Sequence, residues 1–175
     1  MKSRSLKLSV LGCLTAAGAV AVLYVSGTVQ ATPVSPGFAS EILVRAFFER
    51  IRISSPQGGE DEDGGSRVKI LAKDPSDTYV VRNTVAAGAG SGWHSHPGPS
   101  VVMVKSGVAS VYAGDDPSCT PVNYPAGTGF VDAGGSHVHL VRNNGTEPLV
   151  TVAFQIVPTG AQRRIDEPNP GYCPF

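Results

Sequence analysis

The stretches Gly92-Trp93-His94-Ser95-His96 and His137-Val138-His139 decide how this chain is interpreted. The chain contains four histidines, and all of them lie in these two segments. Because residues two apart in a strand point to the same side, each pair would project its imidazoles into one space. Two such pairs on facing strands would form a nitrogen-rich cluster suited to a late first-row transition metal. The predicted metal ligands are His94, His96, His139 and His137.

The sequence around these segments has the pattern of short β-strands. From residue 67 to residue 158, alternating segments such as Thr78 to Ala86 are separated by turn signals such as Asn143-Asn144-Gly145. No long helical period follows Arg50, so a closed all-β sandwich or barrel is expected. The apolar run Val101 to Val104 predicts a strand buried on both faces, and Ser106-Gly107 predicts a hairpin turn.

Two spaced motifs resemble those of the cupin family. His94-x-His96, then Ser100 after three residues and Gly107 after six more, is similar to the first cupin motif. His139, followed after three residues by Asn143, is similar to the second. The resemblance covers residues 67–158 and implies a cupin-type double-stranded β-helix, or jelly-roll barrel, with the histidines at its mouth.

The chain departs from the cupin pattern at two places. The family's Glu ligand would fall at Ser100 or Val101, and neither residue is a carboxylate. Asp132-Ala133-Gly134 stands where the family has Pro-x-Gly, and the following segment is longer than usual. Counting back from Asn143 selects His139 as the second-motif histidine, which the strand register favours, whereas counting forward from Gly134 selects His137. The other histidine of the pair, His137, is then available to replace the missing carboxylate as a fourth ligand.

The ligand set limits the metal. Neutral imidazoles without a carboxylate favour zinc, copper, nickel or ferrous iron over magnesium or calcium, and they separate the chain from germin-like manganese oxidases. The expected cofactor is a divalent transition metal from the set iron, zinc, nickel, copper and manganese. The alternative is that the histidines are polar lining of a barrel mouth without a metal.

The N-terminus has the pattern of a targeting segment. Lys2, Arg4 and Lys7 precede the apolar run from residue 8 to residue 25, and Val29-Gln30-Ala31 fits a signal-peptidase site. A signal peptide over residues 1–31, cleaved after Ala31, predicts a secreted or extracytoplasmic protein without a stable membrane anchor. The alternative is a membrane anchor formed by residues 8–25.

The rest of the chain divides into three parts. Residues 32–66 are expected to be a flexible lead-in with one or two strands and an acidic Gly-rich loop, residues 67–158 the cupin barrel, and residues 159–175 a C-terminal tail. Cleavage would remove three of the fourteen Lys and Arg residues and none of the fourteen Asp and Glu residues, leaving a net charge of −3. No basic stripe remains, so nucleic acid is not expected as a partner. In an exported chain, Cys119 and Cys173 are expected to form a disulfide.

These observations predict a secreted single-domain cupin that binds a transition metal and a small-molecule ligand. It would be a metal-dependent enzyme of the oxygenase type or a non-catalytic binding or sensing module, and no general base is evident beside the histidines. A homodimer is a further expectation, because cupins often associate through their sheets. Trp93 is expected to pack on the side opposite the histidines, and Asn143 to fix the turn before Gly145.

Overall fold

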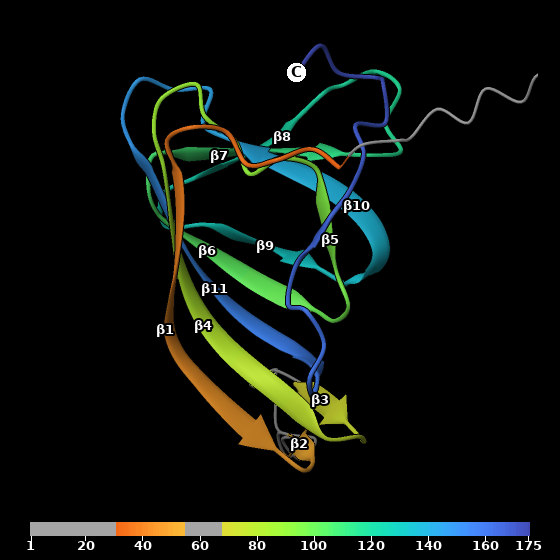
Figure 1. The fold of residues 1–175 in the computed structure, drawn as a ribbon. Coiled ribbons are helices and arrows are strands. Elements are labelled where there is room, and N and C mark those ends of the chain that lie inside the picture. Colours follow the sequence, from red (N-terminus) through yellow and green to blue (C-terminus); the bar gives the residue numbers. More distant parts are fainter. Residues whose placement is uncertain (1–30, 55–67) are drawn as a thin grey trace, which may run out of the picture.

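The computed structural model describes residues 31–54 and 68–175, which contain twelve strands and no helix. One five-stranded antiparallel sheet has the order β1-β4-β11-β6-β9 (Figure 1). Its members are β1 (Phe38–Phe48), β4 (Ser76–Val85), β11 (Leu149–Pro158), β6 (Ser100–Ser106) and β9 (Gly129–Asp132).

A second five-stranded antiparallel sheet has the order β12-β5-β10-β7-β8, and a two-stranded sheet pairs β2 with β3. The members of the five-stranded sheet are β12 (Ile165–Asp166), β5 (His94–His96), β10 (Gly135–Arg142), β7 (Val108–Ala113) and β8 (Val122–Pro125). The small sheet consists of β2 (Ile51–Ser54) and β3 (Lys69–Ala72). It lies next to the C-terminal end of β1 and the N-terminal end of β4 (Figure 1).

The two large sheets face each other, since side chains from β1, β4, β6, β9 and β11 line one cavity together with side chains from β5 and β10. From β4 onward the chain passes repeatedly between the two sheets. This antiparallel double-sheet arrangement is that of a jelly roll. The predicted all-β jelly-roll fold is confirmed. Residues 1–30 of the predicted signal segment, and residues 55–67 with the predicted acidic loop, lie outside the described residues.

Two sequence-based predictions about β6 are wrong. Val101 and Met103 are 43% and 48% exposed, so β6 buries only the face that carries Val102 and Val104. No described layer covers the outer face of this sheet, and alternation therefore decides which residues are buried. The turn at Gly107 is not a hairpin, because β6 pairs with β9 and β11 while β7 pairs with β8 and β10.

Gly107 is the corner at which the chain leaves one sheet for the other. It has φ +76°, and a Cβ there would lie 2.9 Å from the Cα of Leu149. Both the left-handed backbone and the close approach of β11 therefore favour glycine at this position.

The outer face of the second sheet is covered by the C-terminal segment. Trp93 is 1% exposed and packs with Tyr112, Leu140 and Cys173, on the side of β5 opposite the cavity. The predicted disulfide is present between Cys119 and Cys173. The expected packing role of Trp93 is confirmed, and the disulfide joins the chain terminus to the same apolar cluster.

Asn143 holds the turn that precedes β11, as predicted. Its Nδ2 donates hydrogen bonds to the carbonyls of Val85 and Glu147, and its Oδ1 accepts one from the Gly145 amide. Because the side chain is fully buried, these bonds are shielded from competing water.

The lead-in contributes to the main sheet. β1 pairs with β4 in antiparallel register from Phe38 opposite Val85 to Phe48 opposite Ser76, with a register shift between Ile42 and Val44. None of the secondary structure in residues 31–54 and 68–175 is a helix of the length and apolarity needed to span a membrane.

The disulfide gives a stability prediction. Cys119→Ser/Cys173→Ser should lower the free energy of unfolding by about 4 kcal/mol, because the closed loop restricts the unfolded chain. Trp93, the single tryptophan of the chain, reports the unfolding by fluorescence during denaturant titration. Wild type and variant measured with excess reductant serve as the control and should agree. A loss under about 1 kcal/mol would contradict the prediction.

Candidate metal centre

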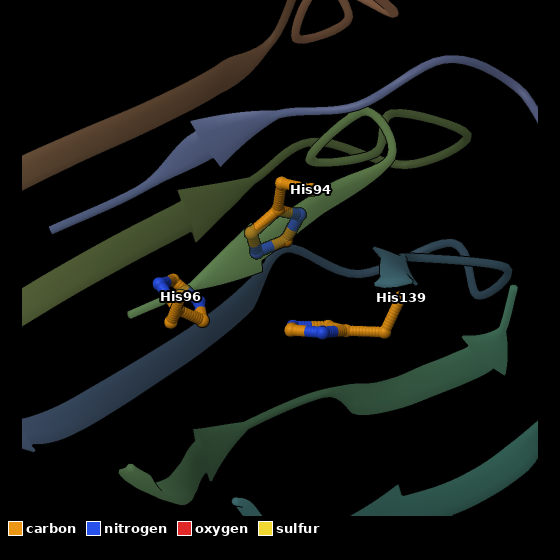
Figure 2. Close-up of side chains that lie close together, drawn as sticks. All are labelled: His94, His96 and His139. Atoms are coloured by element: carbon orange, nitrogen blue, oxygen red, sulfur yellow. The ribbon is translucent and has the colours of Figure 1, made fainter. Parts of the chain in front are cut away.

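Strand geometry brings three histidines together. His94 and His96 alternate on β5 and both point into the cavity, while His139 lies directly opposite His94 in the register between β5 and β10. All three side chains are buried. Figure 2 shows the rings extending from the two strands into one shared space.

The three rings are close enough to share one ion. One candidate ligand atom from each of His94, His96 and His139 lies within 4.8 Å of the other two. The ring centroids are 4.9 Å apart for His94 and His96, 4.3 Å for His94 and His139, and 5.4 Å for His96 and His139. Small side-chain rotations would bring the nitrogens to the distances of about 2.0–2.1 Å from an ion at which imidazoles bind zinc.

Backbone carbonyls orient the two β5 histidines. His94 Nδ1 lies 2.9 Å from the Gly92 carbonyl, and His96 Nδ1 lies 2.6 Å from the Arg163 carbonyl. Because a carbonyl only accepts, each Nδ1 carries the proton, and each Nε2 keeps its lone pair. This is the arrangement in which protein histidines bind metals.

Burial keeps all three imidazoles uncharged. It is the largest cause that lowers the pKa of His94 well below 6.5, with the nearby His139 contributing further. Burial also lowers the pKa of His96, and it lowers the pKa of His139 to about 4. At neutral pH the lone pairs are therefore not blocked by protons.

His137 is not brought into this cluster. Its side chain is 48% exposed, and its Nδ1 lies 3.1 Å from Asp132 Oδ1. It belongs instead to a second group of candidate ligands, with Asp132 and His139, in which the ligand atoms also lie within 4.8 Å of one another. The structure thus places His139 and not His137 beside both histidines of the first motif.

A carboxylate stands one strand away from the position where the cupin pattern has its Glu. Ser100 on β6 is buried and lines the cavity, and its register partner on β9 is Asp132. Asp132 Oδ1 lies 4.0 Å from His139 Nδ1. Among the described residues, His139 Nδ1 and Asp132 Oδ2 are buried without a hydrogen-bond partner. Motif spacing alone could not identify Asp132, because the relevant neighbour is defined by the pairing of β6 with β9.

The cavity beside the histidines has a volume of about 70 Å³. Apolar side chains such as Val85, Val102 and Phe130 form part of its wall, while Gln155, Arg163 and Arg164 add polar groups. The two arginines come from the segment between β11 and β12, which sequence reasoning treated as a tail. No motif pointed to them, since their place at the cavity depends on the pairing of β12 with β5.

Several solved structures resemble this chain at low TM-scores. A protein with a double-stranded β-helix domain from Klebsiella pneumoniae is 25% identical, over 51% of this chain and 75% of that chain, with a TM-score of 0.44. A cupin domain from Bordetella pertussis is 16% identical, over 69% and 94% of the chains, with a TM-score of 0.45. A DMSP lyase from Ruegeria pomeroyi is 16% identical, over 50% and 42%, with a TM-score of 0.43. No family model matches the sequence, and no curated protein matches it.

The buried histidines predict how stability depends on pH. In the protein freed of metal by a chelator, the free energy of unfolding should fall as the pH drops from about 6.5 toward 4. The unfolded chain takes up protons near pH 6.5, whereas folded His139 has a pKa of about 4. Each such histidine contributes a slope of at most about 1.4 kcal/mol per pH unit.

Urea titrations between pH 7 and 5 measure this slope before most carboxylates titrate. His139→Gln should make the slope shallower, since one buried imidazole is removed. Equal slopes for the wild type and His139→Gln would contradict the prediction.

Proposed function

We propose that this chain, which has the cupin-type fold, binds a divalent transition metal through His94, His96 and His139. The observation that carries the proposal is the convergence of three buried, uncharged imidazoles, with candidate ligand atoms within 4.8 Å of one another. Three nitrogen ligands leave coordination positions for water or another ligand. Imidazole donors suit zinc, copper, nickel and iron.

Asp132 is a positioning residue in this proposal. Histidines that bind metals usually donate their second ring N–H to a carboxylate or carbonyl, which fixes the ring and raises its basicity. His94 and His96 already have carbonyl partners, and Asp132 is the carboxylate that faces His139 Nδ1 at 4.0 Å. A shift of about 1 Å would form this bond at ordinary hydrogen-bond length. Asp132 would also offset part of the ion's positive charge.

The cavity supports a small-molecule ligand beside the metal. When bound, a metal with open positions supplies Lewis-acid or oxygen-activating chemistry. Around it the chain supplies burial, an apolar wall and polar side chains such as Gln155 and Ser100, whose Nε2 and Oγ are joined by a 3.0 Å hydrogen bond. These groups would orient a ligand and exclude bulk water.

A binding or sensing module without turnover is the second candidate. The observation that favours it is the lack of an obvious proton acceptor, because Asp132 is the only carboxylate among the described residues lining the cavity and already accepts from His137. Oxygen uptake by the metal-loaded protein over a panel of small molecules distinguishes the two. An enzyme consumes oxygen or substrate, whereas a binder retains the ligand unchanged.

An extracytoplasmic location is part of the proposal. The Cys119–Cys173 disulfide is compatible with it, because such bonds persist in oxidising compartments. The basic and apolar pattern of the N-terminal segment supports export. Mass spectrometry of the protein recovered from the culture medium would test export and cleavage together. Export with cleavage after Ala31 predicts a chain that begins at Thr32.

A homodimer through β1 is also proposed. β1 is an edge strand of eleven residues, paired with β4 on one side only among the described strands. Its large apolar residues are exposed on both faces. Long apolar edge strands tend to pair with another chain. In the proposed dimer, β1 of a second copy pairs with this strand and covers its exposed apolar residues. The exposed residues are Ile42, Leu43, Val44, Phe47 and Phe48.

The metal proposal predicts that the purified protein holds close to one transition metal per chain. His94→Ala, His96→Ala or His139→Ala should abolish binding, because each removes one of three ligands. Asp132→Asn should lower the affinity by about 10- to 100-fold, as loss of such a partner typically does. Elemental analysis and Co²⁺ titration followed by absorbance provide the measurements.

His137→Ala is the matched control for these variants, because its ring is half-exposed and lies outside the cluster. It should retain the metal. Metal content that survives His94→Ala and His139→Ala would refute the centre as proposed.

The dimer proposal predicts that light scattering gives the mass of two chains. Phe47→Lys should shift the protein toward one chain, because a charge within the contact is costly to bury. Val131→Lys, on the exposed face of the opposite edge strand β9, is the control and should leave the mass unchanged. A single-chain mass for the wild type across all concentrations would exclude the dimer.

A further inference from the structure

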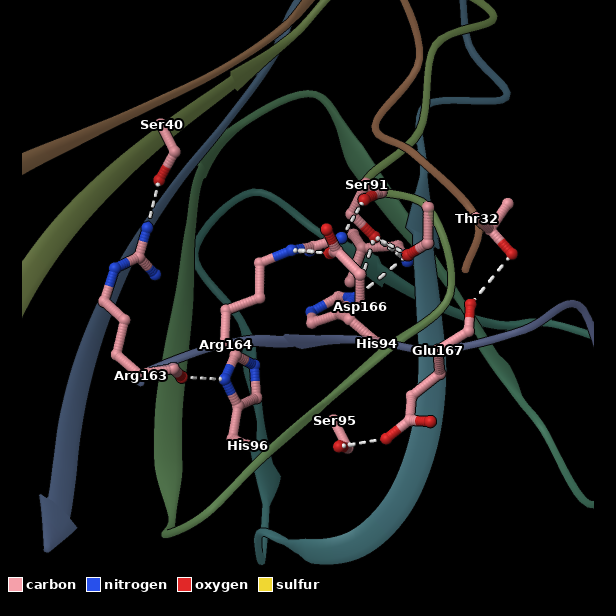
Figure 3. Close-up of polar contacts among 12 residues, drawn as sticks. Thr32, Ser40, Ser91, His94, Ser95, His96, Arg163, Arg164, Asp166 and Glu167 are labelled. Carbon is pink, nitrogen blue, oxygen red and sulfur yellow. Dashed lines mark hydrogen bonds and ion pairs between the residues drawn. The ribbon is translucent and has the colours of Figure 1, made fainter. Parts of the chain in front are cut away.

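The segment that follows β11 brings two consecutive arginines to the cavity. Arg163 and Arg164 both line it, and β12 then pairs with β5 through Ile165 opposite Ser95 and Asp166 opposite His94. Figure 3 shows Arg163 spanning this region, with its carbonyl at His96 and its guanidinium at Ser40. The same residue therefore reaches the metal centre through its backbone and the cavity wall through its side chain.

Arg164 is electrically compensated and fixed in place. Its Nε donates to Asp166 Oδ1 at 2.7 Å, and one terminal nitrogen donates to the Ser91 carbonyl at 2.6 Å. The ion pair with Asp166 compensates the charge of Arg164, and the two contacts together use part of its guanidinium N–H donors. Arg164 is thus occupied within the fold.

Arg163 has no such compensation. Its guanidinium donates to Ser40 Oγ at 3.0 Å and to Gln155 Oε1 at 3.4 Å, and both partners are uncharged. Within residues 31–54 and 68–175 it forms no ion pair. These contacts use two of the five guanidinium N–H donors, which leaves three for water or a ligand.

The surroundings of Arg163 favour a negative partner. Burial, followed by the charge of Arg164, lowers the pKa of Arg163, and the guanidinium nevertheless stays charged at neutral pH. A partly buried cation is costly unless it is paired. The proposed centre adds an ion of charge +2 with uncharged imidazole ligands, and Asp132 is the only carboxylate among the described cavity residues. The cavity is therefore short of negative charge.

The size and the wall of the cavity restrict the anion. Its volume of about 70 Å³ lies far below the roughly 300–1,000 Å³ of pockets for drug-sized ligands. Its apolar wall includes Val81, Val85, Val102 and Phe130, which suits a short hydrocarbon chain better than a fully hydrated ion. A planar carboxylate also matches the fork of N–H donors on a guanidinium.

We propose that Arg163 binds the carboxylate of a small aliphatic acid, which lies in the cavity with its hydrocarbon part against the apolar wall and next to the metal centre. This assignment rests on the proposed function for its position beside the metal, but the Arg163 contact itself requires no metal. In this assignment Arg163 is the residue that selects a negatively charged ligand. The ligand class is then short-chain monocarboxylates.

Calorimetric titration of the Co²⁺-loaded protein with propionate tests the assignment, with propionamide as the uncharged equivalent. Propionate should bind and propionamide should not. Arg163→Gln should weaken propionate binding by about tenfold or more, because a charge-assisted pair is lost. The Co²⁺ content should stay unchanged, since the Arg163 carbonyl that holds His96 belongs to the backbone.

Arg82→Gln is the matched control, because Arg82 pairs with Glu41 on an exposed part of β4. It should bind propionate as the wild type does. The proposal is overturned if Arg163→Gln binds propionate equally well, if the wild type binds none at millimolar concentration, or if inorganic phosphate binds as tightly as propionate.

The same titration with metal-free protein separates the two proposals. Binding of propionate that depends on Arg163, in a protein that cannot hold Co²⁺, would support the carboxylate site and refute the metal centre. A protein that holds Co²⁺ but binds no propionate in either form would refute the carboxylate site alone.

Discussion

Burial of three uncharged imidazoles between two sheets is the constraint on which the centre depends. Polar groups removed from water cost free energy unless they are hydrogen-bonded. His94 and His96 meet this demand through the carbonyls of Gly92 and Arg163. The same bonds determine which nitrogen of each ring remains free. The contacts that satisfy these buried polar groups therefore also leave the Nε2 lone pairs available to a metal. His139 lacks such a bond, and its buried Nδ1 lies 4.0 Å from Oδ1 of Asp132, whose Oδ2 is likewise without a hydrogen-bond partner among the described residues.

The position of that carboxylate affects the electrostatics of the whole cavity. A Glu at position 100 would place a negative charge within the first motif, on β6. Here Ser100 is uncharged, and Asp132 occupies the register position next to it on β9. Since Asp132 also accepts from His137 at the protein surface, its charge is shared between the cavity and a half-exposed imidazole. Less negative charge therefore faces the interior, and within residues 31–54 and 68–175 the guanidinium of Arg163 has no acidic partner.

Local rules predicted the parts of the site that depend on local geometry. Alternation in a strand was enough to place His94 and His96 together and Trp93 on the other side, and turn chemistry was enough to explain Asn143. The sequence could not show which strands pair, and strand pairing determines the remaining features of the fold and the site. The crossing at Gly107, the exposed face of β6 and the neighbourhood of Asp132 all follow from sheet order rather than from spacing. The arginines were missed for the same reason, because β12 has two residues and no recognisable pattern.

The C-terminal segment links the outside of the second sheet to its inside. On the outer face, Cys173 is joined to Cys119 and packs against Trp93. Along the edge, Ser95 Oγ donates to Glu167 Oε1, and the Glu167 amide donates to the Trp93 carbonyl. On the inner side the Arg163 carbonyl accepts from His96. Because one continuous stretch of chain makes all of these contacts, the orientation of a candidate ligand depends on a segment more than sixty residues away in sequence. The cysteine that anchors this segment lies on the opposite face of the sheet, so the disulfide is linked to the histidines through this segment and does not contact them.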